Sequence, residues 1–201
     1  MINIPCFNGS SAPQPIDELK LNGWESIDTA FNDLRIPFVK HFAQLDSNSM
    51  VLDVGCGTGM LLRSLPGSYK VGVDFAPKHI DDLHLYYNME VRCGNFLDIE
   101  FDQKFDTVIG FSVLQYIDSE KADQFIKKAL SIATKSVCFF DVPNADKITE
   151  HQAIDPSQTN IQFYHKDFFH KFSNNVTIQD WNMPFCRFNH VRYNVRIMLN
   201  S

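Results

Sequence analysis

Val51-Leu-Asp-Val-Gly-Cys-Gly-Thr-Gly59 reads as a short apolar strand that runs directly into three alternating glycines. The segment that follows, Met60-Leu-Leu-Arg-Ser-Leu65, has helical character. A strand, turn and helix in this order bring bare backbone N–H groups close to a ligand, because glycine has no Cβ to hold the ligand away. The stretch therefore predicts a site for a nucleotide-type cofactor.

The spacing of the glycines indicates which kind of nucleotide site this is. A dinucleotide fingerprint has the spacing G-x-G-x-x-G, whereas Gly55, Gly57 and Gly59 alternate and position 60 is methionine. A phosphate loop of the Walker type is excluded, since no Gly-Lys-Ser/Thr follows. Asp74 ends a second strand-like run, about 20 residues on, where nucleotide-binding α/β folds place a ribose-binding carboxylate.

Strand-like and helix-like patterns alternate through the middle of the chain. Strands are expected at 50–54, 69–74, 89–92, 105–111 and 136–141, and helices at 58–65, 77–87 and 119–133. Asp118 is a candidate N-cap for the last of these helices. Alternation of this kind predicts the α/β class, with a doubly wound parallel sheet.

The two ends of the chain follow other patterns. Residues 24–45 have helical periodicity, and Pro37 is expected to divide that helix in two. Near the C-terminus a helix is expected at 166–173. Two strand-like runs, 176–181 and 187–199, then follow with a short link, which is typical of a hairpin.

Composition limits the possible partners. The 201 residues carry a net charge of −6 and have no basic stripe, so we expect no nucleic-acid partner. No apolar run approaches ~18 residues and the N-terminus lacks a signal-peptide pattern, so we expect no membrane partner. The five cysteines are widely spaced without a C-x-x-C, which predicts buried free thiols, no metal site and a cytoplasmic protein. The oligomeric state is left open.

With these motifs in order, the chain resembles the class I S-adenosylmethionine-dependent methyltransferases of small bacterial type. Val51–Gly59 resembles motif I of that family, and Asp74 resembles the acidic end of its second strand. Residues 93–98 resemble the segment that holds adenine, and residues 104–117 resemble the fourth strand and the helix start beyond it. The resemblance implies a seven-stranded, mostly parallel, doubly wound sheet with helices on both faces and an antiparallel C-terminal hairpin.

The resemblance also implies a single domain, 1–201, whose successive segments have different roles. Residues 1–45 are expected to form a helical lid or cap, and residues 46–145 the cofactor-binding core. Residues 146–201 are expected to supply a helix and a hairpin on the substrate side. The implied cofactor is S-adenosyl-L-methionine, with S-adenosyl-L-homocysteine as product.

The cofactor residues that the resemblance implies lie at the carboxyl ends of the strands, and they are Asp53, Gly55, Cys56, Gly57, Gly59, Asp74, Phe75, Asn95, Phe96, Phe111 and Ser112. Asp74 is expected to hold the ribose. Asn95 stands where the family more often has aspartate, and its carbonyl can still accept a hydrogen bond from adenine. The residues alone leave other interpretations open, since Asp74 can cap a helix and Asn95 can form a turn.

Position along the chain also suggests residues for the substrate side. Tyr116 and His165 are the foremost catalytic candidates, because histidine titrates near neutral pH and Tyr116 follows the fourth strand. His165 can equally be a surface histidine beside a helix. Further candidates are Trp24, Arg35, Gln115, Asp141, Asn144 and Tyr164. A solvated helix face is the favoured place for Arg35, and packing the favoured role for Trp24.

The leading functional hypothesis is methylation of an oxygen or nitrogen atom of a small molecule, such as a sugar or secondary metabolite. The Asn/Asp-Pro-Pro-Tyr signature of nucleic-acid methyltransferases is absent, and Gly110-Phe-Ser-Val113 occupies its place. A protein methyltransferase and a non-catalytic S-adenosylmethionine-binding module remain as alternatives. A nicotinamide oxidoreductase is disfavoured by the glycine spacing.

Overall fold

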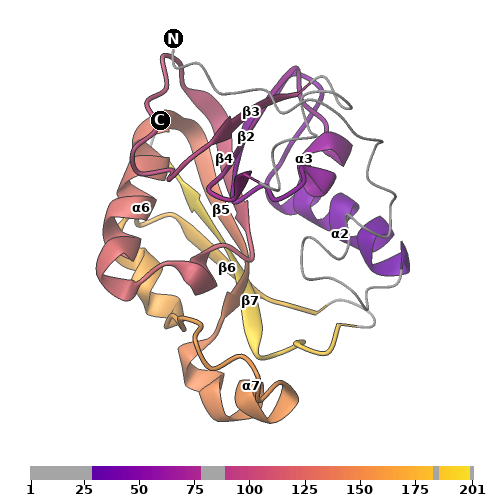
Figure 1. The fold of residues 1–201 in the computed structure, drawn as a ribbon, viewed down its shortest axis with the longest axis vertical. Coiled ribbons are helices and arrows are strands. Elements are labelled where there is room, and N and C mark those ends of the chain that lie inside the picture. Colours follow the sequence, from indigo (N-terminus) through magenta and orange to yellow (C-terminus); the bar gives the residue numbers. More distant parts are fainter. Residues whose placement is uncertain (1–28, 78–88, 183–185, 200–201) are drawn as a thin grey trace.

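The computed structural model describes residues 29–77, 89–182 and 186–199. Its strands are β1 (Met50–Val54), β2 (Tyr69–Asp74), β3 (Glu90–Cys93), β4 (Phe105–Phe111), β5 (Ala133–Pro143), β6 (Val176–Asp180) and β7 (Arg192–Met198). They form one seven-stranded sheet in the order β3-β2-β1-β4-β5-β7-β6 (Figure 1). The chain order reverses between β1 and β4, which is where open α/β sheets bind their ligands.

The strand directions confirm the expected architecture. The pairs among β3, β2, β1, β4 and β5 are parallel, whereas β7 runs antiparallel to both β5 and β6. The C-terminal hairpin therefore completes the sheet with β7 inserted between β5 and β6. β5 is longer than expected at both ends, because Ala133 pairs with Phe105 of β4 and Pro143 pairs with Arg192 of β7.

The helices cover both faces of this sheet. The α-helices are α2 (Thr29–Phe42), α3 (Met60–Ser64), α6 (Ser119–Ile132) and α7 (Ile148–Ile154), and the 3₁₀ helices are η1 (Leu114–Tyr116), η2 (Ala145–Lys147) and η3 (Lys166–Lys171). In Figure 1, α6 lies on one side of the sheet and α2 and α3 on the other.

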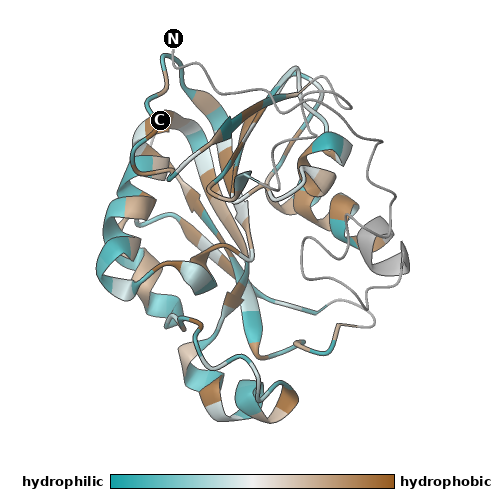
Figure 2. Ribbon diagram, in the orientation of Figure 1, coloured by the Kyte–Doolittle hydropathy of each residue, from teal (hydrophilic) through white to brown (hydrophobic). Residues whose placement is uncertain are grey.

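Two apolar clusters follow from the alternation of side chains along the strands. Leu52 faces the cluster that contains Phe125 of α6, whereas Val51 faces the cluster that contains Val39 of α2 and Leu62 of α3. Figure 2 shows apolar residues along the central strands and hydrophilic residues over much of α6. Burial on both faces explains why the strands read as nearly continuous apolar runs.

The prediction that Pro37 divides the N-terminal helix is wrong for the described part, since α2 runs through Pro37 without a break. Proline in a helix interior costs about 3 kcal/mol. Buried residues on the next turns, Val39 and Phe42, offset that cost, and Phe38 packs edge-on against Trp181. Tertiary packing therefore outweighs the local effect of Pro37 and keeps α2 continuous.

Three further expectations differ from the structure. The helix expected at 166–173 is the 3₁₀ helix η3, and α7 was not expected at all. Asp118 occupies the N-cap position of α6, but its side chain makes no capping hydrogen bond. The helix expected at 77–87 lies almost entirely outside the described residues.

The four described cysteines are free, and two of them, Cys56 and Cys138, are buried as expected. Cys93 and Cys186 are only half-buried, which corrects the expectation for them, and Cys6 lies outside the described residues. Within the described ranges, no helix is long and apolar enough to cross a membrane.

Candidate functional site

The glycine loop between β1 and α3 is held against the end of β2. The backbone N–H groups of Gly55 and Cys56 donate to the carbonyl of Val73, at 2.7 and 3.0 Å. Gly55, Gly57 and Gly59 all have positive φ, at 77°, 55° and 70°, which is the conformation that glycine tolerates best. The loop therefore presents bare backbone at the switch point of the sheet.

Two buried carboxylates flank this loop. Asp53, at the end of β1, is 1% exposed, and Asp74, at the end of β2, is 6% exposed. Burial and the nearby Asp74 raise the pKa of Asp53 to about 7, and Arg35 opposes that shift. The Oδ1 atom of Asp53 has no hydrogen-bond partner among the described residues. A buried, unsatisfied carboxylate is costly, and it suits a cationic ligand group.

Arg35 reaches this region from α2, and its preferred placement on a solvated helix face is wrong. The residue is 3% exposed, and its guanidinium lies 5.0 Å from the centre of the Phe111 ring. Burial lowers the pKa of Arg35 to about 10, while Asp53 and Asp141 oppose that shift. Arg35 thus adds a cation to the carboxylates at the ends of β1 and β5.

The residues expected near adenine have mixed surroundings. Phe75 is 76% exposed, beside Asp74. Asn95 forms a turn, since its Oδ1 accepts from the N–H of Leu97 at 3.2 Å and its Nδ2 donates to Asp98 at 3.0 Å. The Phe96 ring is buried in the core, 4.9 Å from that of Phe125, so only its backbone can meet a ligand.

The wall expected beside the sulfonium consists of Phe111 and Ser112 at the end of β4. Phe111 stacks on Phe140 at 6.1 Å and meets Trp181 edge-on at 5.8 Å. Ser112 has a φ of 54°, an uncommon value for a residue with a Cβ. The chain turns sharply at this point, directly after the strand.

The two foremost catalytic candidates lie on the surface. Tyr116, in η1, is 69% exposed. His165 precedes η3 with a side chain that is 64% exposed, and its Nδ1 lies 2.8 Å from Oδ1 of Asp146. The structure therefore places His165 as a surface histidine beside a helix, and its catalytic role stays a prediction.

The other substrate-side candidates differ in whether their polar atoms have hydrogen-bond partners within the protein. Tyr164 is buried and donates to the carbonyls of Leu114 and Ile117, and Asn144 accepts from the N–H of Asp146. Gln115 is 6% exposed, and its Oε1 has no partner among the described residues. Trp24 lies outside the described residues.

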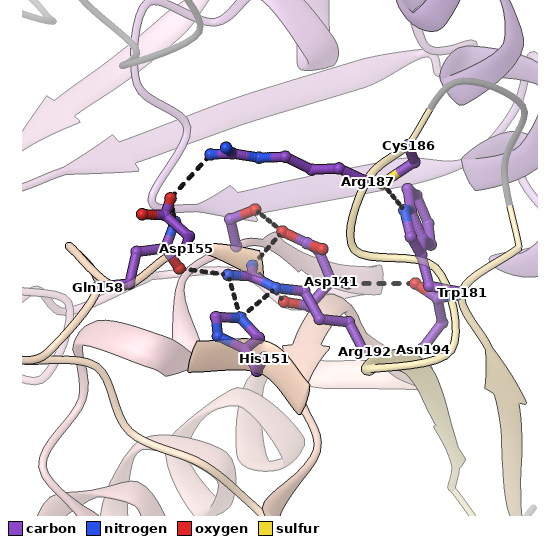
Figure 3. Close-up of polar contacts among 10 residues, drawn as sticks. Asp141, His151, Asp155, Gln158, Trp181, Cys186, Arg187, Arg192 and Asn194 are labelled. Atoms are coloured by element: carbon purple, nitrogen blue, oxygen red, sulfur yellow. Dashed lines mark hydrogen bonds and ion pairs between the residues drawn. The ribbon is translucent and has the colours of Figure 1, made fainter. Parts of the chain in front are cut away.

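A polar network at the end of β5 was missed by sequence reasoning (Figure 3). Arg192 of β7 is only 3% exposed. It donates from Nη1 to Oδ2 of Asp141 at 2.7 Å and from Nη2 to Oε1 of Gln158 at 2.8 Å. Its Nε and Nη2 also lie 3.1 and 3.0 Å from Nε2 of His151. The residues of this network are far apart in sequence. The one sign of it in the sequence is a charged residue, Arg192, within an otherwise apolar strand pattern.

No group of three or more His, Cys, Asp or Glu side chains in the described ranges is placed to hold a metal ion.

The candidate site consists of a glycine loop, two carboxylates and a buried cation at the switch point of a doubly wound sheet. Residues 51–136 match a family model described as "Methyltransferase domain". The match spans less than half of the chain and identifies these residues as a methyltransferase domain.

Solved methyltransferases share the fold of the whole described chain. A magnesium protoporphyrin IX methyltransferase from Synechocystis, with S-adenosylhomocysteine bound, matches with a TM-score of 0.64 at 18% identity, over 96% of this chain and 90% of that one. An S-adenosylmethionine-dependent methyltransferase from Clostridium acetobutylicum has a TM-score of 0.65 at 15% identity, over 92% and 97% of the two chains. At these identities the likeness is one of fold alone.

Curated relatives match the methyltransferase domain over shorter stretches. The ubiquinone biosynthesis O-methyltransferase of Dictyostelium discoideum is 35% identical over 38% of this chain and 29% of its own length. The small RNA 2′-O-methyltransferase of Arabidopsis thaliana is 32% identical over 53% of this chain and 13% of its own length. The chain thus spans less than a third of the length of these relatives, and their substrates are of different classes.

Proposed function

We propose that the protein transfers the methyl group of S-adenosylmethionine to an oxygen or nitrogen atom of a small molecule. The observation that carries the proposal is the pair of buried carboxylates, Asp53 and Asp74, on either side of the glycine loop. The unpartnered Oδ1 of Asp53 suits an ammonium group, and Asp74 suits ribose hydroxyls, and this cofactor carries donor groups of both kinds.

Each residue around the loop then has a task in cofactor binding. Asp53 and Arg35 hold the amino-acid end through its ammonium and carboxylate, and Asp74 accepts from the ribose. Asn95 and the backbone of Phe96 meet the adenine, with Phe75 beside it. The cofactor supplies an electrophilic methyl group, and the rings of Phe111 and Trp181 keep water from that end of the site.

An RNA substrate is the rival suggested by some relatives, and the charges of this chain disfavour it. The net charge is −6. Many described basic side chains are paired with carboxylates, namely Arg92, Lys121, Lys127, Lys135, Lys147, Lys166, Lys171, Arg187 and Arg192. Nucleic-acid binding depends on cations that are free to meet phosphates, so a small acceptor is favoured.

Substrate-side roles are part of the same proposal. Tyr116, in η1 after β4, and His165, directly before η3, flank the acceptor, with residues 1–45 as a lid and residues 146–201 as the substrate side of a single domain. The four cysteines in the described ranges are free, which supports the proposed cytoplasmic compartment.

Calorimetric titration of the purified chain with S-adenosylmethionine, S-adenosylhomocysteine and NAD tests the cofactor site first. We expect micromolar binding of the first two and none of NAD. Transfer of a tritiated methyl group to pools of phenols, amines, sugars, total RNA and protein then tests the substrate class. Binding of NAD alone overturns the proposal, binding without transfer to any pool favours a non-catalytic module, and transfer only to RNA or only to protein replaces the small molecule.

A further inference from the structure

Ser112 and Asp141 lie at the same level of neighbouring strands and share an unusual backbone conformation. The register pairs Gly110 with Phe139 and Phe111 with Phe140 in β4 and β5. Ser112, directly after β4, and Asp141, within β5 where its pairing with β7 is irregular, have φ values of 54° and 59°. Such conformations cost on the order of 1 kcal/mol or more each and persist where the surroundings impose them, often at functional sites.

One oxygen of Asp141 is committed to the protein. Ser112 Oγ donates to Oδ2 at 2.6 Å, and Nη1 of Arg192 donates to the same atom at 2.7 Å. The backbone N–H of Asp141 donates to Oδ1 of Asn194 at 3.2 Å, so the residue is held from three sides (Figure 3). This arrangement fixes the direction of the carboxylate.

The other oxygen is available. Oδ1 of Asp141 accepts no hydrogen bond from the described residues, and the side chain is 13% exposed. Gln115, on the η1 turn that packs against β5, has an unpartnered Oε1 and is 6% exposed. Unpartnered buried acceptors are rare, and they require donors from a ligand or from water.

The position of Asp141 places these acceptors next to the cofactor site. The guanidinium of Arg35 lies 5.0 Å from the centre of the Phe111 ring and interacts electrostatically with both Asp53 and Asp141. Ser112, which follows Phe111 and donates to Asp141, also belongs to the wall proposed beside the methyl group. Asp141 therefore lies next to the methyl end of the proposed cofactor site.

The nearest buried cation on that side is already neutralised. Arg192 donates to Asp141, to Gln158 and to Nε2 of His151, so its guanidinium is fully engaged. His151 is uncharged at neutral pH, because burial lowers its pKa to about 4. A substrate carboxylate would meet the negative charge of Asp141 there, while Arg192 is already paired and Arg35 is assigned to the carboxylate of the cofactor.

We propose that Asp141 binds the methyl acceptor through its free Oδ1 atom, with Gln115 as a second hydrogen-bond acceptor, and that the site selects hydroxyl or amino compounds over carboxylates. The inference rests on the proposed function and names its substrate class. Asp141 is then an acceptor-binding residue, whose Oδ2 contacts with Ser112 and Arg192 aim Oδ1 at the acceptor.

The test compares three ring compounds of similar size on the full chain saturated with S-adenosylhomocysteine. Phenol and benzylamine carry donors, whereas benzoate carries only acceptors, and their dissociation constants are measured by NMR titration. We expect phenol and benzylamine to bind wild type more tightly than benzoate. Asp141→Asn is expected to weaken the two donor compounds by about tenfold, about 1.4 kcal/mol, and to strengthen benzoate.

Asparagine is a suitable substitute because it tolerates positive φ and keeps one oxygen for Ser112. Asp102→Asn is the matched control, because it removes the same charge from an exposed carboxylate between β3 and β4 and should leave all three constants within about twofold. The preference for donors over benzoate is a ratio, so a general loss of stability does not mimic the expected change.

Benzoate binding to wild type as tightly as phenol and benzylamine overturns the inference, as does an unchanged preference in Asp141→Asn. Failure of both donor compounds to bind the loaded protein also overturns it and leaves the proposed function intact. Failure of S-adenosylhomocysteine itself to bind is a different result, since it overturns the proposed function.

Discussion

The backbone N–H of Gly57 donates a hydrogen bond of 2.9 Å to Oδ2 of Asp74. The other oxygen of the same carboxylate accepts from the N–H of Ala76, also at 2.9 Å. Asp74 thus ties the second glycine of the loop to the end of β2 and shapes the turn that follows. The sequence leaves ribose binding and helix capping as alternatives for Asp74. Its bond to Ala76 is a local bond of the capping kind, and its bond to Gly57 places it at the glycine loop, so the two roles are compatible.

Asp74→Ala is expected to weaken S-adenosylhomocysteine binding by about tenfold or more, because the change removes a charge-assisted hydrogen bond to the ligand and one to the loop. Titration calorimetry measures this affinity. Asp102→Ala, at an exposed position between β3 and β4, is the control and should bind like wild type. Equal affinities of wild type and Asp74→Ala would contradict the assignment of Asp74 to the cofactor.

Asp53→Asn is expected to stabilise the cofactor-free protein at neutral to basic pH. The folded pKa of Asp53, about 7, lies above the ordinary value of 3.8, so its contribution to stability is fully present below about pH 4 and is lost as the pH rises to about 7. Urea unfolding at pH 5 and pH 8 should show the variant gaining on wild type by on the order of 1–3 kcal/mol. The same variant should bind S-adenosylhomocysteine more weakly, and parallel pH profiles would contradict the prediction.

His151 is expected to make the protein sensitive to acid. Burial and the neighbouring Arg192 lower its pKa from 6.5 to about 4, so its contribution to stability is present above about pH 6.5 and is lost as the pH falls through about 4. His151→Gln keeps an acceptor for Arg192 and removes the titration. Its stability relative to wild type should therefore rise as the pH is lowered from 7 to about 4.5, in urea unfolding experiments. A constant difference between the two proteins would refute this.

Lys70→Met is expected to destabilise the fold by about 1–3 kcal/mol. The ammonium of Lys70 donates to the carbonyls of Leu62, Arg63 and Leu65, at 3.1, 3.0 and 3.0 Å, and so satisfies the C-terminal end of α3. Methionine keeps the length of the side chain and removes the donors. Lys104→Met, at an exposed position, is the matched control, and equal midpoints of unfolding for the two variants would contradict the prediction.

Much of the fold was predictable because its signals are local. The glycine loop, the strands at 50–54, 69–74 and 105–111, and the long helix α6 stand in the structure close to where the patterns predict them. Hydrophobic periodicity and turn-forming residues identify such elements from short stretches of sequence. The number of strands and the antiparallel direction of the last hairpin came from resemblance to a family, and the order of the strands was not predicted.

The elements that failed are those on which distant residues act. Pro37 does not break α2, because Val39 and Phe42 are buried against the sheet. η3 is a 3₁₀ helix around the buried Phe169, where periodicity suggested an α-helix. In each case packing against residues far away in sequence outweighs the local preference.

The candidate site shows the same division. The part proposed for the cofactor could be predicted from local sequence, since Asp53, the three glycines and Asp74 lie within one strand–helix–strand unit whose geometry depends on neighbouring residues. The other part of the candidate site depends on tertiary contacts. The network of Asp141, His151 and Arg192 depends on β7 lying antiparallel beside β5, which joins residues up to 51 positions apart. A contact of that kind has no local pattern, because the chain pays its loop-closure entropy only when the whole sheet forms.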